Sequence, residues 1–217
     1  TAENNFTHLT IQNDNGIINK SNLGLYVPID ANTSTTTVYD YSDNNFDMSI
    51  AGTGNIVISN IFGNAFDSPR GVWDGLSSDT GGYLSASGVN FGNISTFTAV
   101  VWAINDVGNV TSVQPLFLRG TASTTNDFRL HVATVNDNLV FKLVNSVGGP
   151  GGDKTLNGNV SHNNLNTWHH YGINFNGTDM KVYFDGNQEG NLTFKANINA
   201  ESTIFEIGKF ANLELSK

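Results

Sequence analysis

Trp168, His169 and His170 stand side by side and are of types that bind ligands or transfer protons. Imidazole changes its charge near neutral pH and is a common metal ligand, and an indole ring offers an apolar platform for stacking. The residues that follow alternate between apolar and polar and reach the turn dipeptides Asn176-Gly177 and Asp185-Gly186, which is typical of hairpin strands. Two interpretations remain, an active site and the opening of a packed hairpin. We favour the hairpin, because histidines are more often hydrogen-bonded framework than ligands.

Alternation along the predicted strands sorts their side chains into an inner and an outer set. The inner set is apolar and forms a core: Phe97, Ala99, Val101, Ala103, Phe128, Leu130, Val132, Leu139, Phe141, Leu143, Tyr171, Ile173, Phe175, Met180, Val182 and Phe184. The outer set is aromatic, polar or charged: Trp102, Arg129, His131, His170, Asn174, Lys181 and Tyr183. If these strands share one sheet, the outer set converges on one surface.

An aromatic platform among hydrogen-bonding groups suits a sugar, whose C–H face stacks on the ring while its hydroxyls pair with polar side chains. The candidate glycan-binding residues are therefore Trp102, Arg129, His131, His170, Asn174 and Tyr183. A plainer interpretation stays open. Trp102 and Trp168 suit packing at the end of a strand, and Arg129 and Lys142 suit a solvated sheet surface.

The elements that position these residues are predicted to be strands throughout. No segment repeats apolar residues at helical spacing, whereas short alternating runs are bounded by Gly and Asn. The predicted strands are Leu23–Ile29, Asn55–Ser59, Tyr83–Ser87, Phe97–Ile104, Pro115–Leu118, Phe128–Val135, Leu139–Val144, Trp168–Phe175, Met180–Phe184 and Thr203–Ile207. This pattern predicts an antiparallel sandwich or barrel.

We expect one domain from residue 22 to residue 217, preceded by a polar arm or linker over residues 1–21. The segment Phe210–Lys217 begins like a strand and then stops, so a truncated last strand stays open. The sequence begins with Thr1 and not with an initiator Met, which would fit a leader that was removed or never included.

Charge and composition exclude several classes of protein. The net charge is −9 with only 10 Lys and Arg, which disfavours binding to nucleic acid or to an anionic membrane surface. The chain has no Cys, so disulfides and a thiol nucleophile are excluded. No apolar run approaches the roughly 20 residues that a membrane-spanning helix needs.

Five blocks together resemble LamG-like members of the concanavalin A-like lectin/glucanase superfamily. They are Leu23–Asp30, Val38–Asn45, Ile94–Ala103, Leu165–Gly186 and Ser202–Gly208. Within them, Phe97-Thr-Ala-Val-Val-Trp102 and Val182-Tyr-Phe-Asp-Gly186 carry much of the likeness, and Asp43 replaces a glycine that is usual in the second block. The resemblance implies a two-sheet antiparallel jelly roll whose concave face often binds glycans.

The catalytic motifs of the enzymes in this superfamily are missing. Glucanases carry Glu-x-Asp-x-Glu on one strand, which places paired carboxylates for acid and nucleophile work. This chain has only scattered Glu, and it also lacks the Gln-x-His and Tyr-Phe-Lys-x-Gly motifs of alginate-lyase relatives. Arg129, His131 or His170, and Tyr183 are nevertheless of the types that such lyases use. We expect no catalysis, and a polysaccharide lyase is the lesser alternative.

No cofactor is expected to be required, but the resemblance implies a structural calcium ion, because many relatives use one to pin loops. Calcium prefers carboxylate and carbonyl oxygens, and Asp30, Asp40 and Asp43 lie close in sequence. Their spacing is not that of an EF-hand, and acidic loops are usually only solvated. The site is an expectation for the structure to test.

Two functional hypotheses follow. The first is a non-catalytic glycan-recognition or adhesion module of a larger extracellular or particle-surface protein, whose partner is a glycan or cell-surface polysaccharide. The second is a structural or oligomerisation unit of a viral or phage capsid, tail or fibre protein, whose partners are copies of itself or other subunits.

Overall fold

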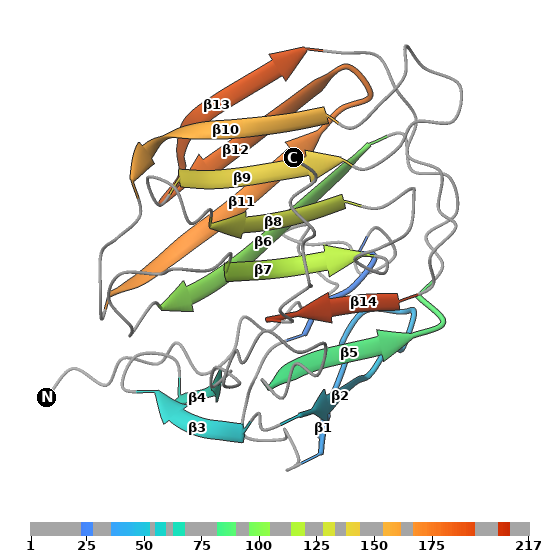
Figure 1. Ribbon diagram of the computed structural model, residues 1–217. Coiled ribbons are helices and arrows are strands. Elements are labelled where there is room, and N and C mark those ends of the chain that lie inside the picture. Colours follow the sequence, from blue (N-terminus) through green and yellow to red (C-terminus); the bar gives the residue numbers. More distant parts are fainter. Residues whose placement is uncertain are drawn as a thin grey trace, which may run out of the picture. The chain divides into compact units, whose positions relative to one another are not determined.

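The computed structural model describes residues 23–27, 36–52, 55–59, 63–67, 82–89, 96–104, 114–119, 128–132, 138–143, 154–161, 167–193 and 204–208. All regular secondary structure within these ranges is β-strand, and every strand pairing described is antiparallel (Figure 1). The predicted all-β antiparallel fold is therefore confirmed. In these ranges, no helix is long and apolar enough to cross a membrane. The predicted arm over residues 1–21 lies outside the described residues.

The chain divides into two compact units, Thr1–Val89 and Asn90–Lys217. In the first unit β1 (Thr37–Val38), β2 (Met48–Ala51) and β5 (Tyr83–Ser87) pair in the order β1-β2-β5. A separate hairpin joins β3 (Asn55–Ser59) to β4 (Gly63–Asp67). Val38, Met48, Leu84 and Val89 are fully buried in this unit.

The predicted opening strand is wrong over Leu23–Val27, where the structure has no regular element. The Tyr26 amide donates to the Asp40 carboxylate at 2.8 Å rather than to a neighbouring strand. The Tyr26 carbonyl accepts from the Tyr41 amide at 2.8 Å. The Tyr26 amide therefore bonds to a side chain, and not to the backbone of a neighbouring strand as the alternation alone predicts. The rest of the predicted strand lies outside the described residues.

The second unit contains two sheets. Sheet I has the order β13-β12-β11-β6 and is built from β6 (Phe97–Ile104), β11 (Trp168–Phe175), β12 (Asp179–Phe184) and β13 (Asn187–Thr193). Sheet II, as far as it is formed by this unit, has the order β14-β7-β8-β9-β10. Its strands are β7 (Gln114–Arg119), β8 (Phe128–Val132), β9 (Asn138–Leu143), β10 (Lys154–Ser161) and β14 (Ile204–Ile207).

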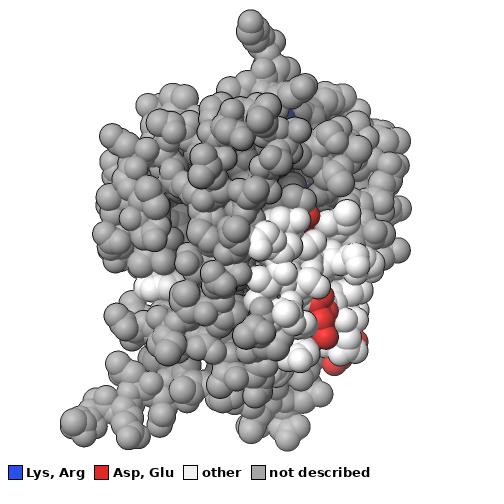
Figure 2. Space-filling model, turned by 60° about the horizontal axis from the view of Figure 1, so that its bottom comes forward, with Lys and Arg blue, Asp and Glu red and all other residues white. Residues whose placement is uncertain are grey.

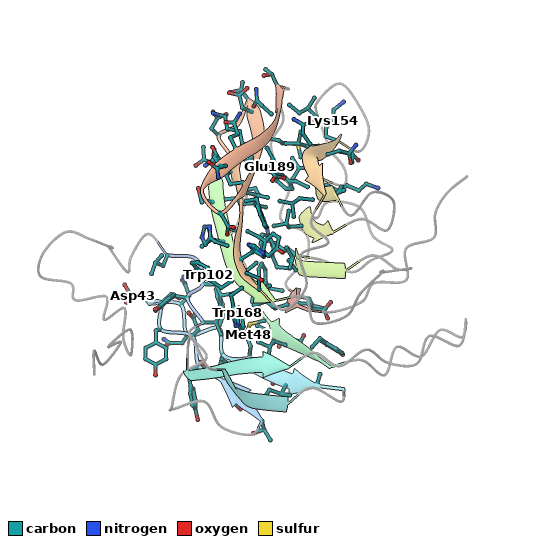
Figure 3. The ribbon with its side chains drawn as sticks, turned by 90° about the vertical axis from the view of Figure 1, so that its left-hand side faces the viewer. Asp43, Met48, Trp102, Lys154, Trp168 and Glu189 are labelled. Atoms are coloured by element: carbon teal, nitrogen blue, oxygen red, sulfur yellow. The ribbon has the colours of Figure 1, made fainter. Side chains whose placement is uncertain are left out.

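The two sheets pack face to face, with side chains filling the layer between them (Figure 3). Phe141 of sheet II and Phe175 of sheet I are fully buried, and Phe97 contacts both, with ring centroids 6.0 and 6.1 Å away. Fully burying a side chain of this size contributes about 1.5–3 kcal/mol. The predicted inner set is confirmed at Leu130, Leu139, Phe141, Leu143, Tyr171, Ile173, Phe175, Met180 and Val182, all buried. The side chains of Phe128 and Val132 lie outside the described part of the structure.

The β12–β13 hairpin has the turn that its sequence predicts. Asp185 (φ 47°) and Gly186 (φ 81°) both adopt left-handed backbone, as a two-residue type I′ turn requires. Between β11 and β12 the Asn176 side-chain oxygen accepts hydrogen bonds from the amides of Thr178 and Asp179, at 2.9 and 2.7 Å. These two turns fix the register of β11, β12 and β13 and therefore decide which side chains leave the core.

Candidate functional site

The side of sheet I that faces away from sheet II carries a compact group of side chains, which we call the outer face. It is formed by Thr98, Val100 and Trp102 of β6, by His170, Gly172 and Asn174 of β11, and by Lys181 and Tyr183 of β12. The register sets these residues in three rows across the strands, since His170 pairs with Trp102, Gly172 with Val100 and Tyr183, and Asn174 with Thr98 and Lys181. Successive rows lie about 7 Å apart along a strand.

The first row is an aromatic corner. The rings of Trp102 and His170 meet edge to face, with their centroids 5.3 Å apart. Trp102 keeps 52% of its surface exposed, which is unusual for so large an apolar side chain (Figure 3). The His170 ring makes no hydrogen bond or ion pair with any described residue. This row therefore offers an apolar ring face beside an imidazole that can donate or accept.

The middle row combines exposed apolar surface with one hydroxyl group. Val100 keeps 59% of its surface exposed, Tyr183 is half-buried, and Gly172 between them has no side chain. The phenolic hydroxyl of Tyr183 has no hydrogen-bonding partner among the described residues. Gly172 itself is buried, and a Cβ built on it would lie 3.5 Å from Val100 Cγ1 and 3.7 Å from Tyr183 Cβ, so the side chains of its two neighbours cover its backbone.

The third row is polar. The Asn174 amide nitrogen donates to the Thr98 hydroxyl at 2.8 Å, which fixes the orientation of that side chain. No described residue donates to the remaining Asn174 carbonyl oxygen, and Lys181 forms no ion pair with a described carboxylate within 4 Å. The carboxylate of Asp179, two residues before Lys181, accepts hydrogen bonds from the Thr193 hydroxyl at 2.6 Å and from the side-chain amide of Asn176 at 3.2 Å. These bonds, with the attraction of Lys181, outweigh desolvation and lower the pKa of Asp179.

The structure brings together four of the predicted glycan-binding residues: Trp102, His170, Asn174 and Tyr183. It does not bring Arg129 and His131 to them, because β8 belongs to sheet II rather than sheet I. The predicted convergence is therefore wrong for these two residues. Alternation fixes which side of a strand a residue takes, but not which sheet the strand joins.

Two members of the outer face, Val100 and Gly172, were not predicted as site residues. Val100 has the apolar character that favours the core, and it is exposed because β6 has apolar residues on both sides. Gly172 has no side chain to attract notice. A glycine inside a strand is itself a signal, since it often marks the close approach of a ligand or another backbone.

His169, by contrast, is part of the framework. The residue is 8% exposed, its ring centroid lies 4.5 Å from that of Phe184, and Nδ1 is 2.8 Å from Asp185 Oδ2. The other carboxylate oxygen of Asp185 accepts a hydrogen bond from the backbone amide of His170 at 2.9 Å. Asp185, in the β12–β13 turn, therefore holds the first residues of β11 through both of its oxygens. Partial burial alone would raise the pKa of Asp185, but the hydrogen bonds from the His170 amide and the His169 ring, with the charges of both imidazoles, lower it.

A second polar group lies between the sheets. Tyr171 is buried, and desolvation raises the pKa of its phenol to about 12, with further contributions from the charges of Asp185 and Glu189. Glu189 of β13 is 7% exposed and points toward β10, where Gly158 leaves room for it (Figure 3). The side-chain amide of Asn159 donates a hydrogen bond to the backbone carbonyl oxygen of Glu189 at 2.7 Å. Residues so enclosed stabilise the sandwich and do not reach a ligand on the outer face.

A family model described as the concanavalin A-like lectin/glucanases superfamily matches residues 78–213, more than half of the chain. The chain belongs to this superfamily. The match covers all of β6 to β14, and so includes every strand of the outer face. With this family and the paired sheets, the predicted jelly-roll sandwich is confirmed.

Solved structures of the concanavalin A-like fold resemble this chain at low sequence identity. Domain 4 of the arabinanase AbnA from Geobacillus stearothermophilus, in complex with arabinotriose, is 14% identical with a TM-score of 0.58, covering 82% of this chain and 84% of that one. A structure titled HCR/D-Sa-GBL1/C is 18% identical with a TM-score of 0.61, covering 87% of this chain and 44% of that one. No curated protein matches the chain.

A third similar structure is the enzymatically active domain of tailspike protein 2 from bacteriophage CBA120. It is 13% identical with a TM-score of 0.53, covering 88% of this chain and 28% of that one. This chain therefore spans less than a third of the tailspike domain and less than half of the HCR/D-Sa-GBL1/C chain. At these identities the likeness shows the fold.

The calcium ion that the resemblance implies at Asp30, Asp40 and Asp43 stays a prediction, because the described residues include only two of the three carboxylates. The Asp40 carboxylate already accepts hydrogen bonds from the Tyr26, Ser42 and Phe46 amides and from the Ser42 hydroxyl, at 2.7–2.9 Å. Asp43 is exposed, and Asp30 lies outside the described residues. Across the described ranges no group of three His, Cys, Asp or Glu is placed to hold a metal ion. Asp40 therefore organises its loop directly, through protein donors.

Acidic side chains outnumber basic ones over the chain as a whole, with 19 Asp and Glu against 10 Lys and Arg. In the view of Figure 2 the described surface is mainly uncharged, with a few acidic groups. The residues of the outer face include one basic side chain, Lys181, and no carboxylate, although Asp179 lies beside Lys181.

Proposed function

We propose that the chain is a non-catalytic carbohydrate-binding module whose site is the outer face of sheet I. The observation that carries the proposal is Trp102, half exposed on a sheet face and in contact with the His170 ring. Tyr183 lies one row from Trp102, and Asn174 and Lys181 lie two rows from it. Among the described residues, the only hydrogen bond of these three side chains is the one that Asn174 donates to Thr98.

This combination matches the chemistry of a sugar. The C–H face of a sugar ring stacks on an indole, and hydroxyl groups need donors and acceptors at the edge of that contact. Lys181 donates, Asn174 Oδ1 accepts, and the Tyr183 hydroxyl does both. A glycan laid over the three rows would satisfy these groups while it covers Val100 and Trp102, which otherwise stay in water.

The similarity to the arabinanase domain supports this proposal, because that domain was solved in complex with arabinotriose and its fold covers most of this chain. The superfamily also takes its name from lectins and glucanases. Neither likeness names the glycan for this chain.

The proposal is decided by a glycan array followed by titration calorimetry on the oligosaccharides that bind. Trp102→Ala should weaken binding by about 10- to 30-fold, the effect of losing a central aromatic anchor. Thr155→Ala, an exposed change on β10 of sheet II, serves as the matched control and should bind like the wild type. An array without a single bound glycan, or equal affinities for Trp102→Ala and the control, would reject the proposal.

The absence of catalysis is part of the proposal. Glycoside hydrolysis uses two carboxyl groups about 5–9.5 Å apart across the bond that breaks. The full sequence lacks the Glu-x-Asp-x-Glu strand of the glucanases, and Glu189 points between the sheets, not at the outer face. We expect no release of reducing ends from bound polysaccharides and no unsaturated product from alginate. Either signal, if lost in Tyr183→Phe or His170→Ala, would overturn this part.

A second candidate function is a structural or oligomerisation unit of a virus or phage particle. The likeness of 88% of this chain to part of a phage tailspike domain supports it. Light scattering on a size-exclusion column distinguishes the two. A stable trimer or higher oligomer that binds no glycan favours the structural unit, whereas a glycan-binding monomer favours the module.

We propose an extracellular or particle-surface location for the parent protein, since a polysaccharide ligand is met there. Antibody labelling of intact cells or particles of the source tests this. Labelling only after permeabilisation would contradict it.

A further inference from the structure

The side of sheet I that carries the outer face continues onto β13. The Thr193 hydroxyl donates to the Asp179 carboxylate at 2.6 Å, and the two residues are paired in the ladder, so both side chains lie on this side. Asn191, two residues before Thr193, is exposed and pairs with Lys181. Residues directly opposite each other in an antiparallel ladder take the same side of the sheet. Asn191 therefore lengthens the third row by one strand.

A bulge in β13 brings a second amide to the same side. The register of the β12–β13 ladder shifts between Val182 and Tyr183, which leaves Glu189 as the extra residue. The Glu189 carboxylate points between the sheets (Figure 3). One extra residue reverses the alternation that follows it, so the exposed Gln188 lies on the same side as its partner Tyr183. Gln188 therefore ends the middle row.

These two amides are open to a ligand. Neither the Gln188 nor the Asn191 side chain makes a hydrogen bond with another described residue. A side-chain amide presents donors and an acceptor in one plane, which suits neighbouring sugar hydroxyls that donate and accept. With the Tyr183 hydroxyl and the Lys181 ammonium group, they make the β12–β13 half of this surface a hydrogen-bonding half.

The β6 half of the surface is apolar. Val100 and Trp102 keep 59% and 52% of their surfaces exposed, and the Thr98 hydroxyl already accepts a hydrogen bond from Asn174. A glycan needs an apolar surface for its ring faces and polar groups for its hydroxyls. A glycan along β6 would meet mainly the first, and one along β13 mainly the second. Only a glycan that crosses the strands meets both.

The surface is continuous along this crossing. Val100 Cγ1 and Tyr183 Cβ lie 3.5 and 3.7 Å from one point, the Cβ position of Gly172, so their side chains cover the backbone between β6 and β12. Trp102 and Gln188 are three strand spacings apart, about 14 Å, and one row apart along the strands, about 7 Å. This span exceeds a single sugar ring, so a ligand that reaches both residues has several rings.

The charges along the crossing favour a neutral ligand. Lys181 is the one described cation there, and Asp179, held on the same side by Thr193 and Asn176, offsets it. The chain as a whole carries a net charge of −9, which repels a polyanion at long range. A chain of uronate or sulfated sugars would meet this field with little local compensation.

We propose that the ligand is a linear, uncharged oligosaccharide that crosses the strands of sheet I from Trp102 to β13, where Gln188 and Asn191 bind its far end. This inference rests on the proposed carbohydrate-binding function. One ring stacks on Trp102, the chain passes over Val100 and Tyr183, and the last rings bond to the two amides. Recognition therefore depends on the length of the glycan, and a terminal sugar alone meets only the Trp102 end.

The first test is calorimetry on the full chain with di- to pentasaccharides of the arabino-, malto- and cello-series, and of any other neutral linear glycan that the array selects. Affinity should rise about 10-fold or more from the disaccharide to the tetrasaccharide of the series that binds, since each added hydrogen bond contributes about 2- to 10-fold. Tetragalacturonate, the acidic probe, should bind at least about 10-fold more weakly than the neutral tetrasaccharide.

The second test removes the two amides. The double variant Gln188→Ala/Asn191→Ala should weaken the tetrasaccharide by about 10-fold and leave the disaccharide within about 2-fold of the wild type. Asn157→Ala, an exposed asparagine on β10 of sheet II, is the matched control and should bind both like the wild type. Thermal melts should coincide for all of these proteins, because the changed side chains are exposed.

Nitrogen-15 NMR gives a readout that stability does not move. The side-chain amide signals of Gln188 and Asn191 should shift when the tetrasaccharide is added and stay in place with the disaccharide. The side-chain amide signal of Asn157 should not move with either.

Three results would overturn the inference, and they differ in what they leave standing. Wild-type affinity for the tetrasaccharide in Gln188→Ala/Asn191→Ala, together with weakened binding in Trp102→Ala, removes the crossing and keeps the binding module. Equal affinity for disaccharide and tetrasaccharide, or stronger binding of tetragalacturonate, removes the long neutral ligand and likewise keeps the module. No binding of any probe to the wild type, with a blank glycan array, rejects the proposed function and this inference with it.

Discussion

The two sides of β11 carry the same kinds of residue and use them differently. His169 and His170 are neighbours in sequence, yet His169 is buried against Phe184 and held by Asp185, while His170 lies on the outer face beside Trp102. The glycines of sheet I also differ, since Gly190 lets β10 approach, whereas Gly172 has room for a methyl group between Val100 and Tyr183. Residue type alone therefore does not separate framework from binding site. The side of the strand does, because only one side can hold a ligand.

The largest expected effect tests this contrast through stability. Phe175→Ala, on the inner side, should lower the free energy of unfolding by about 3–5 kcal/mol, because it leaves a cavity beside Phe97. Trp102→Ala, on the outer side, should change it by no more than about 0.5 kcal/mol while it weakens glycan binding. Urea denaturation of both variants measures the difference. Equal losses of stability would mean that Trp102 packs as a core residue.

The second prediction concerns alkaline pH. The pKa of Tyr171 is about 12 in the folded protein, against about 10 for an exposed tyrosine. Because the folded pKa is raised, the unfolded state loses its proton first, so stability is complete below about pH 10 and falls as pH rises toward 12. The loss should be on the order of 2–3 kcal/mol. Tyr171→Phe should flatten the decline in urea melts between pH 9.5 and 11.5, whereas Tyr183→Phe should not.

The third prediction compares the two glycines. Gly190→Ala should destabilise the fold by about 1–3 kcal/mol, because the new methyl crowds Leu156 and the Asn157 carbonyl. Gly172→Ala should leave stability unchanged or raise it by about 0.5 kcal/mol, because alanine restricts the unfolded chain more than glycine. Thermal denaturation of the pair checks the order. A Gly172→Ala variant less stable than Gly190→Ala would contradict the difference in room at the two positions.

The smallest expected effect lies at acid pH and concerns the clamp at the start of β11. The pKa of Asp185 is lowered in the folded protein, so its contribution to stability is present above the unfolded value near 3.9 and is lost as pH falls below it. Asp185→Asn should therefore show a shallower fall in melting temperature between pH 5 and 2.5 than the wild type.

A double-mutant cycle assigns this effect to a partner. In a His169→Phe background, Asp185→Asn should have less effect on stability than it has alone, because the hydrogen bond to the His169 ring is already gone. Additive effects of the two substitutions would show that the ring and the carboxylate act independently.

Sequence reasoning found strands best where apolar residues alternate strongly. The predicted bounds of β3, β5, β6 and β11 are those of the structure, and β12 begins only one residue earlier. It missed β1, β2, β4, β10 and β13. β10 and β13, with the sequences Lys-Thr-Leu-Asn-Gly-Asn-Val-Ser and Asn-Gln-Glu-Gly-Asn-Leu-Thr, have little alternation of their own. They are strands because β9 and β12 supply ladder partners, and Gly158 and Gly190 allow close packing.

Four of the six predicted glycan-binding residues come together on the outer face. The other two, Arg129 and His131, lie on a strand of the other sheet. Alternation assigned Trp102, His170, Asn174 and Tyr183 to one side of their strands, and the register of β6, β11 and β12 then placed them in neighbouring rows. Register depends on turns and on hydrogen bonds between strands distant in sequence, which no single segment encodes.

The sequence by itself determined that this chain folds into antiparallel strands with an apolar inner side, and that it carries the blocks of the concanavalin A-like superfamily. Local alternation and turn dipeptides are enough for that, because each reflects the geometry of a single strand or hairpin. Only the tertiary structure decided that His169 is framework and His170 is not, and that Val100 and Trp102 stay exposed on the outer face. These properties depend on which strands become neighbours, and pairing across the sheet is a long-range outcome of packing.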